Sequence, residues 1–347
     1  MSRRTNGHHP EESPDGEEAN AVDGAGGTTG NRGKALSIET DGLQLIYSDG
    51  TEAVRDVSLS VPEGEFFGFL GANGAGKTTA IKVLATLLKP TNGEAFINGF
   101  DAESEPREIR ESIGYMAQEI GIDEELTARE NLQFACAAYG VPRGERSERI
   151  EELLALVDLA GVADQRSESF SGGMQKRLDA ATALVHRPPL VFLDEPTTGL
   201  DPNGAREMRE LIRQESERGA TIFFSSHILS QVEAVCDTVG ILQSGQLIAK
   251  DSVEGLRDAV QGGMTLWVTL ADPASDVGTV EDTVSGLEGA SVTETDGDRV
   301  AIGCNSTQKM DVLNALNDAG VDVANFETED QSLEELFTAY TEQEVKA

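Results

Sequence analysis

Apolar runs alternate with helical patterns between residues 35 and 250. Residues 65–70, 190–193 and 221–224 form short, nearly continuous apolar segments, the pattern of strands buried on both faces of a parallel sheet. After the first segment, apolar residues recur at helical spacing until Pro90 closes the pattern, at Ile81, Leu84, Ala85 and Leu88. This alternation predicts an α/β domain with a mostly parallel sheet.

A helical insertion is predicted at about residues 119–170. Thr127 and Glu130 have the spacing of a capping box at the start of one helix, and a second helical pattern follows it. The expected buried positions are Leu132, Ala135, Cys136 and Tyr139 in the first helix and Ile150, Leu153, Leu154 and Val157 in the second. The insertion therefore interrupts the α/β pattern before the second strand.

The two ends of the chain differ from this central part. Residues 1–34 are rich in Gly and polar residues and predict a disordered leader. Residues 251–347 predict a separate accessory domain, with strands at 264–271, 290–295, 299–304 and 321–326 and helices at 275–287, 307–319 and 333–340. That order suggests a small α+β domain of the split-βαβ, ferredoxin-like kind with one extra helix.

Composition excludes some classes of function. No apolar stretch is long enough to span a bilayer, and the first residues lack the apolar segment of a secretory signal. The formal net charge is −35, divided as −2 over residues 1–34, −16 over 35–250 and −17 over 251–347. Because nucleic-acid binding needs a basic face, this acidity argues against a nucleic-acid partner.

The charged residues also suggest the salt content of the solution in which the protein works. The chain has 8 Lys against 19 Arg, and its acidity is spread over the whole sequence. A Lys-poor acidic surface fits a salt-rich cytoplasm, where self-repulsion is screened; an acidic mesophilic protein is the alternative.

The cysteines, Cys136, Cys236 and Cys304, lie far apart and fit no metal spacing, so we expect reduced thiols in a cytosolic protein.

The strongest chemical signal is at residues 71–78, Gly-Ala-Asn-Gly-Ala-Gly-Lys-Thr, which fits the phosphate-binding pattern G-x-x-x-x-G-K-[S/T]. Glycines let the backbone wrap a phosphate, and the following helix adds its positive N-terminal end. Lys77 is expected to reach the β- and γ-phosphates of ATP, and Thr78 to bind Mg²⁺. The strand before the loop and the amphipathic helix after it make an ordinary Gly-rich turn a poor alternative.

Acidic and imidazole side chains follow two other predicted strands. Asp194 and Glu195 come directly after the run 190–193, and His227 comes just after the run 221–224. Strand ends in such a sheet form the ligand-binding edge. We expect Asp194 to hold Mg²⁺, Glu195 to orient or deprotonate the attacking water, and His227 to contact the γ-phosphate. Taken alone, Asp194 and Glu195 have solvated strand-end acids as the alternative, and His227 has an ordinary surface or core histidine.

A second Gly-rich helix start occurs at Ser171-Gly172-Gly173-Met174. Two glycines at a helix start suggest another anion-binding end. One ATP loop together with a second such end suggests a dimer, in which this segment of each chain covers the ATP of the other. Taken alone the segment is a weak signal, and a flexible turn is its default interpretation.

Together these motifs resemble the nucleotide-binding domain of ABC transporters over about residues 36–250. Leu190–Glu195 is similar to the Walker B segment, Phe170–Met174 to the family signature and Gly199-Leu200-Asp201 to the D-loop. Gln118 resembles the Q-loop glutamine, and His227 the switch histidine. The resemblance implies a P-loop NTPase fold with an antiparallel β subdomain and a helical insertion.

The resemblance also implies roles for residues. Tyr47 is expected to stack on adenine, and Gln118 joins Thr78 and Asp194 as a Mg²⁺ ligand. The remaining phosphate contacts are expected from Gly71, Asn73, Gly74, Gly76, Lys77 and Thr79 in one chain and from Ser171, Gly172, Gly173 and Met174 in the other. Met174 stands where the signature more often has Gln, and Ala117 where Pro often precedes the Q-loop glutamine. Neither departure touches a phosphate-contacting glycine.

Two further segments resemble one branch of the family. The sequence Phe-Ser-Gly-Gly-Met-Gln-Lys-Arg-Leu at 170–178 and the tail Ser-Leu-Glu-Glu-Leu-Phe at 332–337 look like the daunorubicin-resistance-type, ABC-2 type drug-export ATPases. This implies an ATPase homodimer on the inner face of the cell membrane, powering a separately encoded permease that exports drugs, lipids or other small molecules. A soluble ABC-type ATPase of translation or DNA repair is the main alternative, and a non-hydrolysing regulatory module is a third hypothesis.

Overall fold

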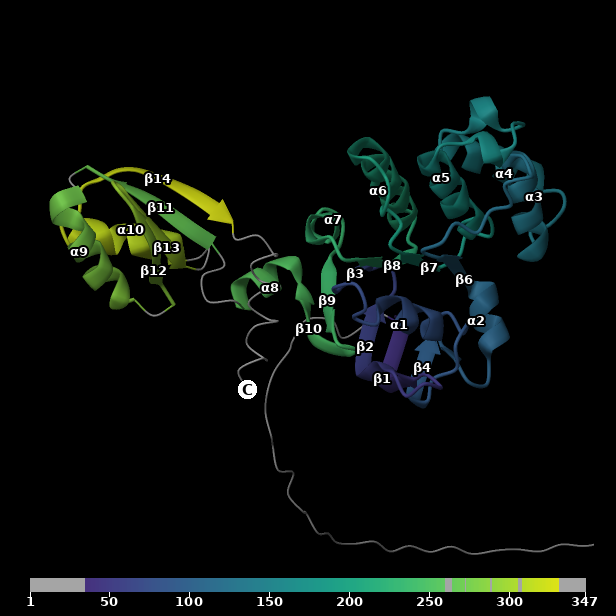
Figure 1. The fold of residues 1–347 in the computed structure, drawn as a ribbon, viewed down its shortest axis with the longest axis horizontal. Coiled ribbons are helices and arrows are strands. Elements are labelled where there is room, and N and C mark those ends of the chain that lie inside the picture. Colours follow the sequence, from purple (N-terminus) through teal and green to yellow (C-terminus); the bar gives the residue numbers. More distant parts are fainter. Residues whose placement is uncertain (1–34, 260–263, 272, 288, 305–307, 331–347) are drawn as a thin grey trace, which may run out of the picture. The chain divides into compact units, whose positions relative to one another are not determined.

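The computed structural model describes residues 35–259, 264–271, 273–287, 289–304 and 308–330 (Figure 1). The predicted leader at 1–34 and the predicted last helix at 333–340 lie outside these residues. Within the described ranges, no helix combines the length and the apolar character that crossing a membrane requires.

A six-stranded sheet organises the N-terminal part of the chain, in the order β10-β9-β3-β8-β7-β6. All neighbouring pairs are parallel except β10 with β9. The strands are β3 (Phe66–Leu70), β6 (Ile113–Met116), β7 (Leu190–Asp194), β8 (Thr221–Ser226), β9 (Thr238–Gln243) and β10 (Gln246–Ser252). The mostly parallel α/β sheet predicted from the sequence is confirmed, and its three apolar runs are adjacent strands β3, β8 and β7.

A second, antiparallel sheet has the order β2-β1-β4-β5. Its strands are β1 (Leu36–Ile46), β2 (Glu52–Pro62), β4 (Asn92–Ile97) and β5 (Phe100–Asp101). Helix α1 (Lys77–Leu84) shares an apolar cluster with this sheet. Side chains of this sheet, α1 and one face of the six-stranded sheet share one apolar cluster, which includes Ile81, Phe67 and Phe223. This sheet is the antiparallel β subdomain that the family resemblance implied.

Helices cover the opposite face of the six-stranded sheet. These are α3 (Ala128–Ala138), α4 (Arg146–Leu156), α5 (Gly172–Ala183), α6 (Pro202–Glu217) and α7 (Leu229–Glu233). Their apolar residues form a second cluster with Phe66, Leu70 and Phe224. Because strand residues alternate between faces, Phe66 and Phe67 serve different clusters. Gly68 of β3 lets α7 pack closely, since a Cβ there would lie 2.4 Å from Val232 Cγ1.

Two helix predictions need correction. Helix α1 ends at Leu84, so Leu88 lies beyond it, because Thr86 takes a left-handed conformation with φ 58°. The capping box of α3 is confirmed, but Tyr139 is the C-cap of that helix and is 37% exposed rather than buried. Its ring stacks on His186 at 4.0 Å between ring centroids. The second predicted helix is α4, with Ile150, Leu153, Leu154 and Val157 all buried.

The N-terminal part also contains α2 (Pro106–Ser112) and α8 (Val253–Ala259). The C-terminal part contains an antiparallel sheet in the order β12-β13-β11-β14. Its elements run β11 (Met264–Leu270), α9 (Pro273–Ser285), β12 (Ser291–Asp296), β13 (Arg299–Cys304), α10 (Lys309–Asp318) and β14 (Val323–Asp330). This part is α+β, as expected. Its ferredoxin-like assignment and the boundary near residue 250 stay predictions.

Candidate nucleotide-binding site

The Gly-rich loop connects β3 to α1, and two of its glycines are required by close backbone contacts. A Cβ at Gly71 would lie 2.5 Å from the carbonyl oxygen of Leu242, and a Cβ at Gly76 would lie 2.2 Å from that of Ala53. Gly76 is also the N-cap of α1 with φ 105°, a conformation that favours glycine. The loop therefore packs closely against the backbone of Leu242 and Ala53. At the start of α1, backbone N–H groups without intrahelical partners are available to bind an anion.

Lys77 begins α1 and is almost fully buried, at 5% exposure. Its Nζ donates to the carbonyl oxygens of Gly71 at 2.6 Å and Ala72 at 3.3 Å. It also lies 3.2 Å from Glu195 Oε1 in an ion pair. The lysine of the loop after β3 therefore reaches the carboxylate that follows β7.

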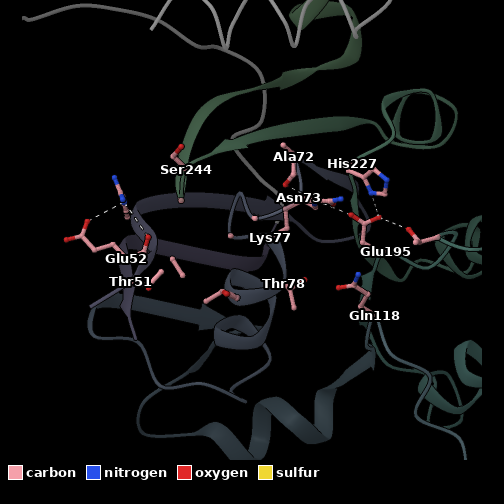
Figure 2. Close-up of a pocket in the computed structure, with 17 residues that line it drawn as sticks. Thr51, Glu52, Ala72, Asn73, Lys77, Thr78, Gln118, Glu195, His227 and Ser244 are labelled. Carbon is pink, nitrogen blue, oxygen red and sulfur yellow. Dashed lines mark hydrogen bonds and ion pairs between the residues drawn. The ribbon is translucent and has the colours of Figure 1, made fainter. Parts of the chain in front are cut away.

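Glu195 links three segments of the site (Figure 2). Its Oε2 accepts a hydrogen bond from Thr198 Oγ1 at 2.8 Å and lies 2.8 Å from His227 Nδ1. Its backbone has φ 54°, and its N–H donates to Ser225 Oγ at 3.0 Å. Because β3, β8 and β7 are adjacent and parallel, Lys77, His227 and Glu195 follow neighbouring carboxyl ends of the sheet.

Asp194 is fully buried beside this group. Its Oδ1 accepts a hydrogen bond from Ser225 Oγ at 2.7 Å, whereas its Oδ2 has no hydrogen-bond partner among the described residues. Burial raises the pKa of Tyr115 to about 12, and the carboxylates of Asp194 and Asp179 add to that shift. A buried carboxylate oxygen with free lone pairs fits the oxygen ligands that Mg²⁺ prefers.

Lys77, Glu195 and His227 border a cavity of about 560 Å³. Of the residues expected at the site, its lining includes Asn73, Gly74, Gly76, Lys77, Thr78, Thr79, Gln118, Glu195 and His227. Tyr47, Gly71 and Asp194 are not among the lining residues, but Tyr47 Oη lies 3.1 Å from Thr79 Oγ1. The structure therefore brings most of the predicted phosphate, metal and catalytic residues to one cavity.

One wall of the cavity was missed by the sequence analysis. It consists of Thr51, Glu52, Ala53 and Arg55 from β2 and the residues just before it, and of Ser244 and Gly245 from the β9–β10 turn. Arg55 N–H donates to Gly245 O, and Gly245 N–H donates to Ala75 O, each at 2.8 Å. These residues match no phosphate-binding pattern, and only the folded backbone brings them beside the Gly-rich loop.

The second Gly-rich segment lies elsewhere. Ser171 is the N-cap of α5, and its Oγ accepts a hydrogen bond from the Met174 N–H at 3.3 Å. Asp201 caps α6 in the same way, accepting from the Gly204 N–H at 2.7 Å. None of Ser171, Gly172, Gly173, Met174 and Asp201 lines the cavity of its own chain. Ser171, Gly172 and Asp201 are exposed.

Comparison with known proteins identifies relatives of the chain. A sequence profile of the ABC transporter family matches residues 54–198. The chain is 35% identical over 308 residues to the daunorubicin/doxorubicin resistance ATP-binding protein DrrA of Streptomyces peucetius, covering 88% of this chain and 92% of that protein. It is 41% identical over 209 residues to the ABC transporter ATP-binding protein NatA of Bacillus subtilis, covering 60% and 85%.

Solved structures agree with these relatives. An ATP-binding subunit of an ABC transporter has a TM-score of 0.59 at 33% identity, covering 64% of this chain and 92% of that one. The dimeric cassette MJ0796 in a post-hydrolysis state with ADP and Pi has a TM-score of 0.58 at 27% identity, covering 62% and 98%. A role in translation or DNA repair is not favoured, because the relatives are transporter ATP-binding proteins. The chain belongs to the ABC transporter family, as an ATP-binding and ATP-hydrolysing subunit.

Proposed function

We propose that Lys77, Glu195 and His227 are the catalytic residues for ATP hydrolysis in this cavity. The supporting observation is that the three residues follow neighbouring strand ends and that Glu195 contacts both of the others, Lys77 Nζ at 3.2 Å and His227 Nδ1 at 2.8 Å. The β- and γ-phosphates are bound by Lys77 and by the backbone N–H groups at Gly74 and Gly76. Thr79 and the other loop residues, Gly71 and Asn73, also contact the phosphates. Glu195 orients and deprotonates the attacking water, and His227 contacts the γ-phosphate.

Phosphate binding changes the contacts of Lys77. Its ammonium group is held by Glu195 and two loop carbonyls, so the γ-phosphate competes with Glu195 for the same cation. When Lys77 turns to phosphate, one oxygen of Glu195 becomes free to accept a proton from water. His227 and Thr198 still hold the other oxygen and so keep the carboxylate in place. Tyr47 provides the ring for adenine next to Thr79.

Thr78, Gln118 and Asp194 are proposed to hold Mg²⁺. Thr78 and Gln118 line the cavity, and Asp194 supplies the unpartnered buried oxygen described above. The ion would neutralise negative charge on the β- and γ-phosphates of ATP.

The complete site is proposed to form between two copies of the chain. Ser171, Gly172, Gly173 and Met174 of one copy cover the ATP of the other, and the D-loop residue Asp201 lies at the same junction. Two observations support this proposal: these residues are outside their own chain's cavity, and the related cassette MJ0796 is dimeric. The γ-phosphate bridges the two copies, so hydrolysis allows them to separate.

The dimer is proposed to power a separate integral-membrane permease that exports drugs, lipids or other small molecules, from a position on the inner face of the cell membrane. The names of the relatives support this class of cargo, since they include daunorubicin resistance and bacitracin transport proteins. Phe134 of α3 is 72% exposed in the helical insertion, and an exposed aromatic ring of this kind suits a contact with a protein partner.

The residue roles are tested by two variants with opposite expected effects. Lys77→Ala should lose ATP binding, measured by calorimetry, and phosphate release. Glu195→Gln should retain ATP and accumulate as an ATP-bound dimer, measured by light scattering, because the water is no longer activated. Lys89→Ala, at an exposed ion pair with Glu103, is the control and should behave like the unsubstituted protein. If Lys77→Ala released phosphate at the rate of the unsubstituted protein, the assignment of the site would be refuted.

A further inference from the structure

Lys176 is a buried lysine that no part of the proposed site includes. It lies in α5, two residues after Met174, and is 8% exposed. Its Nζ donates hydrogen bonds to two backbone carbonyl oxygens, that of Glu195 at 3.3 Å and that of Thr198. Burial lowers the pKa of Lys176, against the opposing effect of the nearby Glu195 and Asp179 carboxylates. A cation held in this position is costly unless its donors are satisfied.

The two carbonyls belong to the segment that presents the Glu195 carboxylate to the cavity. Glu195 has φ 54°, a strained conformation for a non-Gly residue that persists only where its surroundings hold it. Thr198 N–H donates to Glu195 O at 3.1 Å, and Thr198 Oγ1 donates to Glu195 Oε2 at 2.8 Å. Backbone and side chain of residues 195–198 thus form one hydrogen-bonded turn, and Lys176 binds it at both ends.

The same helix contacts a second segment near the cavity. Asp179, one turn after Lys176, accepts a hydrogen bond from the Gly121 N–H at 3.2 Å. Gly121 follows the cavity residue Gln118 by three positions. A Cβ at Gly121 would lie 3.3 Å from Asp179 Oδ1, so the backbone approaches the carboxylate closely. Helix α5 is therefore attached to both the Gln118 segment and the Glu195 segment of its own chain.

We infer that Lys176 is a positioning residue for hydrolysis, which holds the Glu195–Thr198 turn and makes the Glu195 carboxylate follow movements of α5. Helix α5 begins with the segment that contacts the partner's ATP, so Lys176 connects that contact to the catalytic carboxylate of its own chain. The inference rests on the proposed function, because it takes Glu195 to be the group that activates water. Lys176 donates to carbonyl oxygens, which carry no formal charge. The positioning role therefore requires its hydrogen-bond donors rather than its positive charge.

The test compares three substitutions in the full chain: Lys176→Met, Lys176→Gln and, at an exposed lysine, Lys89→Met. Turnover is measured as phosphate release per ATP bound at saturation, so that any misfolded fraction is excluded from the rate. Lys176→Met removes the donors and should lower kcat by about tenfold or more, with the Kd for ATP within about twofold. Lys176→Gln keeps an N–H donor and should recover part of that loss. Lys89→Met should equal the unsubstituted protein.

Two results would overturn the inference. One is an unchanged kcat for Lys176→Met, and the other is a kcat for Lys176→Gln no higher than that of Lys176→Met. Lys77→Ala, measured in parallel, distinguishes a failure of the proposed site from a failure of the positioning role. If Lys77→Ala hydrolyses ATP normally, the proposed site itself fails; if Lys77→Ala is inactive while Lys176→Met is normal, only the positioning role fails.

Discussion

Asp179 should make the protein less stable as the pH rises from about 5 to about 7.5. Asp179 is 6% exposed, and its Oδ2 has no hydrogen-bond partner in the described part of the chain. Burial raises the pKa of Asp179 from 3.8 to about 6, although the Gly121 N–H and the Lys176 ammonium oppose the shift. Between these two pKa values the folded protein binds more protons than the unfolded chain, so the free energy of unfolding falls with pH.

The magnitude follows from the size of the pKa shift. One pKa unit corresponds to about 1.4 kcal/mol, so complete ionisation of Asp179 costs on the order of 3 kcal/mol. At about pH 5 roughly half of that cost is already present, which leaves about 1.4 kcal/mol to develop by about pH 7.5. Asp179→Asn cannot ionise and should lose this part of the pH dependence. Fixed packing effects of the amide cancel when the two pH values are compared.

The assay is urea unfolding of the nucleotide-free protein at several pH values above its isoelectric point of about 4.3. Far-UV circular dichroism follows the whole fold. The single tryptophan, Trp267, lies in β11 of the C-terminal part and provides a separate signal that the substitution should leave unchanged. Asp158→Asn, at an exposed aspartate, is the matched control. Identical pH dependence in Asp179→Asn and the unsubstituted protein would show that the buried carboxyl does not titrate as argued.

Three further predictions follow from the same structure. Burial lowers the pKa of His186 to about 4, so its contribution should make the free energy of unfolding rise between about pH 4 and 6.5, opposite in sign to that of Asp179. His186→Phe should lose this pH dependence in urea unfolding, and a pH dependence equal to that of the unsubstituted protein would contradict the prediction. Gly76→Ala should lose ATP binding by calorimetry, whereas Gly140→Ala, with φ 71° and open space around its Cβ, should keep it. Molar KCl should raise the thermal unfolding midpoint, because it screens a net charge of −35, and a flat response would refute adaptation to salt.

The repeating patterns of the sequence predicted most of the architecture. Alternating apolar runs indicated the three central strands, and the capping box at Thr127 and Glu130 marked the first residue of α3. Prediction failed where a single backbone conformation decided the outcome. Thr86 ends α1 by taking φ 58°, and no propensity distinguishes that threonine from one inside a helix.

For the site, the sequence alone determined which residues we propose for the chemistry. The Gly-rich loop, the two acids after β7 and the histidine after β8 are recognisable because phosphate and water chemistry require those residue types at strand ends. Only the tertiary structure decided how they are held. Lys176 is one position in an ordinary polar helix pattern, and it becomes a buried donor to Glu195 and Thr198 because α5 packs against the turn after β7. Contacts between residues far apart in the chain depend on packing, which local pattern does not encode.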